Sequence, residues 1–300
     1  MRPVLCRCTP VLSACYGFVL LLGLVACGES STAPTQMVDS GSWYRTGYRW
    51  PHDGDPYESE HFIVYSDAAS LDARVQAATI GEELFASLRQ DFGIESDTLF
   101  RFPAGQSKIH IYAYKDHYEP DWGGRAYYGG VMIYSLDNPR RASAGNTQLD
   151  VYTGVVKHEL MHAIQFLLQG SDDPNLADAW LTEGIAEYVS GGTAGGSIHD
   201  PARLDSLVDK YGALNPIAMH QYHYPDVELI AYSYYYPMFE LAVTYLLDPS
   251  GAGGAKSSIR NIFLDVGEGI PFATAFEDRL GIGLAEYEDQ FFDRIRVFLR

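Results

Sequence analysis

Cysteine and basic residues are scarce in this 300-residue chain. The four cysteines all lie near the N-terminus, so the chain beyond Cys27 has neither disulfides nor thiolate metal ligands. Any metal ion there must be held by His and carboxylate side chains. The chain has 21 Lys and Arg against 39 Asp and Glu, a formal net charge of −18. Because phosphate binding needs a positive surface, we expect no nucleic-acid partner.

One apolar run near the N-terminus is typical of a signal peptide. Residues 11–25 are apolar and uncharged, and they follow the basic residues Arg2 and Arg7. A run of about 15 residues is too short to span a bilayer comfortably as a permanent helix. We therefore interpret residues 1–26 as a secretory signal rather than as part of the fold.

The end of this run indicates how the chain is anchored. The tetrad LVAC at 24–27 resembles the bacterial lipobox, in which the signal is cut before the cysteine and the cysteine is lipidated. Residues 27–42 are then a flexible polar tether. We expect a lipid on Cys27 to attach the protein to a membrane in the bacterial cell envelope, outside the cytoplasm. A plain secretory signal with a chance cysteine is the alternative.

Hydrophobic periodicity from residue 43 onward predicts an α+β domain. Short β-branched or alternating segments predict strands at 59–67, 107–116 and 127–135, with a helix at 70–92 after the first. Helical spacing then predominates, at 149–170, 178–189, 201–212, 238–247, 256–265, 271–280 and 284–299. A mixed sheet followed by helices is the α+β pattern. We expect one domain over 43–300, with a sheet-containing lobe (43–148) and a mainly helical lobe (149–300).

The hexapeptide KHELMH at 157–162 predicts a metal site on the first of the later helices. His158 and His162 are four residues apart, so they lie on one helix face about 6 Å apart along the axis and can bind one ion. Glu159 is rotated by about 100° from His158, toward a position where it can act as a base on the metal's water. The alternative is an ordinary buried helix with two incidental histidines.

The segment WLTEGIAEY at 180–188 offers the third ligand. A catalytic zinc site takes its third ligand from a separate element and leaves one position open for water, and Glu183 on the next helix suits that role. Glu187, one turn later, can accept a hydrogen bond from the far nitrogen of a ligating histidine. A solvated acidic face is the alternative, which fits poorly because the stretch is otherwise apolar.

HELMHAIQF (158–166) followed by WLTEGIAEY resembles the gluzincin metallopeptidases. It is more closely similar to the bacterial peptidase-MA-like domains, with the signature H-E-x-x-H and then W-L-x-E-G-x-A-E-Y. The resemblance is strong over 155–190 and looser over 59–150 and 232–300. The metzincin pattern is disfavoured, because its glycine and third histidine would fall at Gln165 and Leu168.

The resemblance implies a zincin-like fold with the active-site helix between two lobes. It also implies one Zn²⁺ held by His158, His162 and Glu183, with Glu159 as general base and Glu187 orienting a ligand. In gluzincins an edge strand before the metal helix binds extended peptide by backbone pairing. The candidate here is 129–134, with Gly130, Val131 and Met132 at its centre, and a fully paired interior strand is the alternative.

The residue that stabilises the oxyanion is harder to assign from the sequence. Relatives commonly use a Tyr or His from a later helix, and the sequence offers several: His220, His223, Tyr232, Tyr234, Tyr235 and Tyr236. We favour Tyr235 or Tyr236 from their place before the helix at 238–247. The alternative is that these tyrosines pack between the lobes.

The predicted function is zinc-dependent hydrolysis of a peptide or protein substrate by a metal-activated water. We favour an endopeptidase, because no amine-anchoring acidic motif precedes the metal helix. The alternative is a catalytically inactive binding or scaffold lipoprotein that keeps a zinc site for stability. A structural site usually has four protein ligands, whereas three are found here, and it has no use for Glu159.

Overall fold

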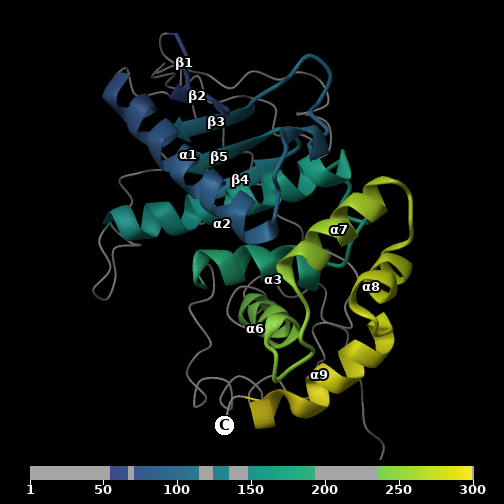
Figure 1. The fold of residues 1–300 in the computed structure, drawn as a ribbon. Helices are drawn as coiled ribbons and strands as arrows, with labels where there is room; N and C mark the ends of the chain where they lie inside the picture. Colours follow the sequence, from purple (N-terminus) through teal and green to yellow (C-terminus); the bar gives the residue numbers. More distant parts are fainter. Residues whose placement is uncertain (1–54, 67–70, 115–123, 135–147, 193–234, 299–300) are drawn as a thin grey trace, which may run out of the picture. The chain divides into compact units, whose positions relative to one another are not determined.

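The computed structural model describes residues 55–66, 71–114, 124–134, 148–192 and 235–298 (Figure 1). These residues belong to one compact unit, Gln36–Arg300. The predicted signal peptide, the tether, Cys27, the predicted helix at 201–212 and residues His220, His223, Tyr232 and Tyr234 lie outside the described residues. The described part combines a mixed sheet with later helices, which is compatible with the predicted α+β class.

A five-stranded sheet forms the first half of the described fold. Its order is β1-β2-β3-β5-β4, where the strands are β1 (Tyr57–Glu58), β2 (Phe62–Ser66), β3 (Ile109–Tyr114), β4 (Gly124–Tyr127) and β5 (Gly130–Tyr134). The three central strands run parallel, and β1 and β4 pair antiparallel at the two edges. The three predicted strands are therefore confirmed, whereas the short strands β1 and β4 were not predicted.

The predicted substrate edge strand is wrong in position. β5 contains Gly130, Val131 and Met132, and it pairs with β3 on one side and with β4 on the other. Its backbone groups are used within the sheet on both sides, so it offers no free edge to a peptide. The edge strand nearest to the metal helix is β4.

Two long helices cover one face of this sheet (Figure 1). α1 (Leu71–Phe92) packs on β2, and α2 (Gln148–Gln169) packs on β4 and β5. Burial alternates along β2, which explains why the helices cover one face of the sheet. Phe62 and Val64 are fully buried, while Ile63 and Tyr65 point to the other face. α2 ends at Gly170, whose φ of +73° allows its N–H and that of Ser171 to bond the carbonyl of Phe166.

The remaining helices build a second layer beyond α2. α3 (Ala179–Ser190) packs against both α2 and α6 (Tyr236–Leu247). α7 (Lys256–Gly267) also contacts α2, and α8 (Phe272–Leu280) and α9 (Leu284–Phe298) follow it. All of these helices begin and end within about two residues of their predicted bounds, a normal spread for helix ends.

One glycine sets how closely α3 and α6 approach. A Cβ placed on Gly184 would lie 2.8 Å from the carbonyl carbon of Phe239 and 2.9 Å from Val243 Cγ2. The backbone of α6 occupies the space that any side chain would need. Glu183 directly precedes Gly184, so it lies on a helix that packs closely against α6.

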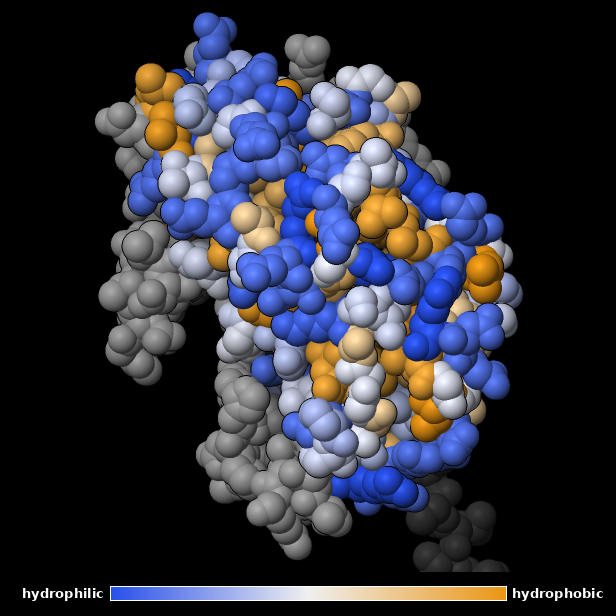
Figure 2. All heavy atoms as spheres, viewed as in Figure 1, coloured by the Kyte–Doolittle hydropathy of each residue, from blue (hydrophilic) through white to orange (hydrophobic). Residues whose placement is uncertain are grey.

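The described surface is mostly polar. In Figure 2 hydrophilic residues predominate on the visible face, with hydrophobic atoms scattered between them. Among the described residues, the large hydrophobic side chains that are exposed are Leu71 and Ile270. No helix within the described ranges combines the length and the apolar character needed to cross a bilayer.

Candidate metal centre

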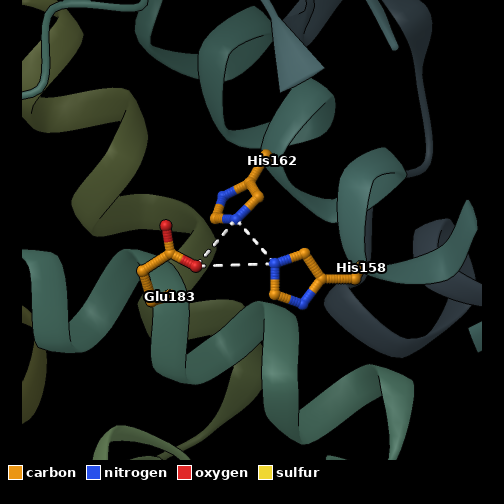
Figure 3. A group of neighbouring side chains, drawn as sticks. All are labelled: His158, His162 and Glu183. Atoms are coloured by element: carbon orange, nitrogen blue, oxygen red, sulfur yellow. Dashed lines mark hydrogen bonds and ion pairs between the residues drawn. The ribbon is translucent and has the colours of Figure 1, made fainter. Parts of the chain in front are cut away.

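Three buried side chains from two helices converge at one point (Figure 3). His158 and His162 extend from one face of α2, and Glu183 comes from α3. All three are less than 9% exposed. Within the described ranges they form the one group of three or more His, Cys, Asp or Glu side chains with ligand atoms close enough to hold a metal ion.

The three ligand atoms form a nearly equilateral triangle. The Nε2 atoms of His158 and His162 are 3.2 Å apart, and Glu183 Oε2 lies 3.2 Å from His162 Nε2 and 3.4 Å from His158 Nε2. Tetrahedral zinc with bonds of about 2.0–2.1 Å places its ligands about 3.3–3.4 Å apart. The donor set and its spacing therefore fit a single zinc ion.

Each histidine is oriented by a partner at its other ring nitrogen. His158 Nδ1 lies 2.9 Å from Glu187 Oε1, an ion pair at hydrogen-bond distance although the N–H direction is not well aligned. His162 Nδ1 lies 3.0 Å from Gln165 Oε1. Because acceptors at Nδ1 favour the proton on that nitrogen, both Nε2 lone pairs turn toward Glu183. Two lone pairs and a carboxylate so close together require a cation or a shared proton between them.

The pKa values of the three groups are consistent with a shared proton when no metal is bound. Burial alone lowers the pKa of His158, but its close contacts with the carboxylates of Glu183 and Glu187 outweigh burial and raise it well above the ordinary value. Burial also lowers the pKa of His162, but the charge of Glu183 outweighs burial and raises this pKa above the ordinary value. Burial raises the pKa of Glu183, but the charge of His162 and bonds to both histidines lower it to about 2. The pocket therefore attracts positive charge.

Glu159 is buried beside this triangle but is not one of its corners. Burial raises the pKa of its carboxyl, while the charges of His158 and His162 act in the opposite direction. Its side chain lies against β4, because a Cβ on Gly124 would be 2.6 Å from Glu159 Cγ. A buried carboxyl with a raised pKa, next to a ligand set, is suited to proton transfer.

The two candidate tyrosines occupy different environments. The ring of Tyr236 lies 6.4 Å from the ring of His158, and its side chain is half-buried at the start of α6. Tyr235 is 1% exposed and packs against Phe239, and burial raises the pKa of its hydroxyl. Tyr236 therefore lies beside one of the candidate ligands.

Two residues of this centre were not predicted from the sequence. Gln165 orients His162, and its place three residues after His162 puts it on the same helix face, a spacing that could have identified it. Gly124 packs on Glu159, but no local pattern distinguishes it from its neighbour Gly123. The structure places His158, His162, Glu183 and Glu187 together as the spacing predicted.

No family model matches this chain, and no curated protein matches it.

Proposed function

We propose that this protein is a zinc-dependent hydrolase of peptide bonds. The observation that carries the proposal is the buried triangle of His158, His162 and Glu183, with both histidines oriented and Glu159 directly beside it. The resemblance of the two helices to gluzincins, and to peptidase-MA-like domains in particular, supports the same reading. His158, His162 and Glu183 would hold one Zn²⁺.

The protein's own groups divide the work of the reaction. Zinc in such a site supplies a Lewis acid and brings the pKa of a bound water toward neutrality. Glu159 accepts a proton from the attacking water and donates it to the leaving amine. Tyr236, beside His158, is the proposed hydrogen-bond donor to the oxyanion.

β4, the edge strand on this side of the sheet among the described strands, is the proposed place for the substrate. β4 pairs with β5 on one side, and it packs on α2 through Gly124 at Glu159. An extended peptide that pairs with β4 on the side away from β5 would run past the general base. Such a peptide can continue in both directions, which favours cleavage inside a chain over removal of a terminal residue.

Removal of the base tests the proposed reaction. We expect the zinc-loaded wild type to cleave casein or a mixed peptide library, and Glu159→Gln to retain its zinc while turnover falls by about 10²–10⁴-fold. Zinc content and cleavage are measured on the same samples. Cleavage by Glu159→Gln at the wild-type rate would refute the role of Glu159. A zinc-loaded wild type that cleaves nothing would instead favour the zinc-stabilised binding lipoprotein.

We also propose that the protein is held in the bacterial cell envelope by a lipid on Cys27. The lipobox-like tetrad at 24–27 and the polar stretch after it support this location. Expression in a bacterium with labelled fatty acid tests it. Label in the wild type and none in Cys27→Ser is the expected result, and equal labelling of both would contradict lipidation at this residue.

A further inference from the structure

We propose that Gln165 is a positioning residue that fixes the ring orientation of His162 and couples it to the helix carrying Glu183. Gln165 lies on α2, is fully buried, and does not touch the metal position itself. The inference rests on the metal centre within the proposed function. It does not depend on whether the bound metal hydrolyses peptides.

The amide of Gln165 has only one orientation that satisfies both of its partners. Its Nε2 donates to the backbone carbonyl of Thr182 at 2.9 Å, and its Oε1 lies 3.0 Å from His162 Nδ1. A backbone carbonyl can only accept hydrogen bonds, so the NH₂ end of the amide must face Thr182. The carbonyl end therefore faces His162.

The fixed amide determines the protonation of the ring. Because Oε1 can only accept, the hydrogen at this contact must be on His162 Nδ1. The lone pair of Nε2 then points into the triangle, 3.2 Å from both His158 Nε2 and Glu183 Oε2. Gln165 thereby selects the tautomer in which His162 can act as a ligand.

The same amide joins the two ligand-bearing helices. Thr182, whose carbonyl receives the Nε2 hydrogen bond, directly precedes Glu183 on α3. The chain of contacts runs from the α3 backbone through Gln165 to the ring of His162. A shift of α3 relative to α2 would disturb Glu183 and the orientation of His162 together, so the third ligand and the second are positioned as a unit.

The choice of an amide has an electrostatic reason. Three carboxylates, those of Glu159, Glu183 and Glu187, are already buried at this site. His158 is oriented by the carboxylate of Glu187, whereas His162 is oriented by a neutral group. A fourth carboxylate at position 165 would add buried negative charge and would face the carbonyl of Thr182 with a second acceptor. Glutamine avoids both costs.

The test compares Gln165→Met with a matched control, Gln169→Met. Gln169 is one turn later on α2 and is also buried, but within the described residues it makes no hydrogen bond to a ligand. Zn²⁺ affinity is measured by chelator competition on the full chain. We expect the dissociation constant to rise about 10–100-fold in Gln165→Met and to change little in Gln169→Met. Equal effects of the two substitutions would overturn the proposal.

A spectroscopic readout separates orientation from general stability. In the Co²⁺-loaded protein the paramagnetic shift displaces the ring N–H resonance of each ligating histidine from the rest of the spectrum. We expect the resonance of His162 to shift and to exchange faster with water in Gln165→Met, while that of His158 is unchanged. Two unchanged resonances would contradict the role assigned to Gln165.

The wild type alone gives a second check if Gln165→Met does not fold. In the zinc-loaded wild type the His162 Nδ1–H should exchange slowly with water, because its acceptor is a fully buried amide. Fast exchange at that proton would overturn the proposal without any variant. A wild type that binds no metal would also overturn it, whereas one that binds metal without cleaving peptide would refute only the hydrolase.

Discussion

The backbone of Gly124 lies directly against the side chain of Glu159. A Cβ built on Gly124 would be 2.6 Å from Glu159 Cγ and 3.0 Å from Val155 Cγ1. Both distances are shorter than ordinary contacts between carbon atoms, which are about 3.5–4.0 Å. The edge strand and the proposed base can therefore be this close only because position 124 has no side chain.

Substitution of Gly124 should displace the base without disturbing the ligands. We expect Gly124→Ala to lower kcat by up to about 100-fold, because a displacement of about 1 Å can cost that much. Zinc affinity should be unchanged, since the triangle is made by α2 and α3 alone. Ala126→Gly, two residues along the same strand, is the control for a general change in the packing of β4. Full activity of Gly124→Ala would show that Glu159 does not depend on this contact.

The two tyrosines should respond differently to loss of their hydroxyl groups. We expect Tyr236→Phe to lower kcat by about 10²–10³-fold with zinc retained, the scale for removal of one oxyanion donor. Tyr235→Phe should leave kcat near the wild-type value, because its ring packs against Phe239 in the core. Steady-state kinetics of the two variants decide the assignment. The reverse pattern would transfer the role to Tyr235.

Metal affinity should fall as the pH is lowered. In the metal-free protein the pKa values of His158 and His162 are raised, so both rings keep their protons to a higher pH than a free histidine does. Zinc binds only neutral imidazole, so a protonated ring must lose its proton before it can bind. Below the pKa of a ring, this requirement weakens the apparent zinc affinity by about tenfold per pH unit for that ring. Glu183, with a pKa of about 2, does not compete in this range. Chelator competition at several pH values measures the slope, and a flat profile from pH 8 to 6 would contradict it.

A polar contact between α1 and the residues just before β2, far along the chain from α2, should contribute to the stability of the fold. Glu82 on α1 accepts hydrogen bonds from the side chain of Ser59 and the backbone N–H of His61, and it lies 2.6 Å from His61 Nδ1. Burial raises the pKa of Glu82, but these hydrogen bonds outweigh it and lower the pKa below the usual value of 4.5. Because the folded-state pKa of Glu82 lies below 4.5, the contact stabilises the fold above pH 4.5. This stabilisation is lost as the pH falls through the folded-state pKa.

Glu82→Gln tests that contact. We expect the free energy of unfolding to drop by about 1–3 kcal/mol at pH 7, as for a hydrogen bond to a charged group, toward the lower end because the contact is only partly buried. The difference from wild type should shrink as the pH falls below 4.5, because the wild type then loses the same contribution. Glu83→Gln, at the exposed neighbouring position, is the control. A pH-independent difference would show that the carboxylate charge is not involved.

Local patterns were enough to predict the described helices and the convergence of His158, His162 and Glu183. Ligand spacing on α2 depends only on the helical repeat, and the apolar neighbours of Glu183 already indicated a buried acid with a partner. The strands β1 and β4 have two and four residues, too few to show a period. Local sequence also does not state which strand lies at an edge, and for that reason the apolar β5 was mistaken for the edge in place of β4.

The supporting residues were missed because their roles exist only in the folded chain. Gln165 acts through the carbonyl of Thr182 on another helix, and Gly124 acts by close approach to Glu159 from another strand. The spacing of Gln165 from His162 indicates a contact on one helix face but not the contact with Thr182, and Gly124 leaves no periodic or compositional sign in the sequence. The proposed ligands are thus easier to predict than the residues that hold them in place.

The central claim is that His158, His162 and Glu183 together hold one metal ion. Zinc per chain, measured by elemental analysis after loading with excess zinc and desalting, tests it most directly. We expect about one zinc per chain in the wild type, and almost none in His162→Ala and Glu183→Ala, because two remaining ligands do not hold the ion. Glu83→Gln should keep the wild-type content. A wild type without zinc, or a full complement in either ligand variant, would contradict the account.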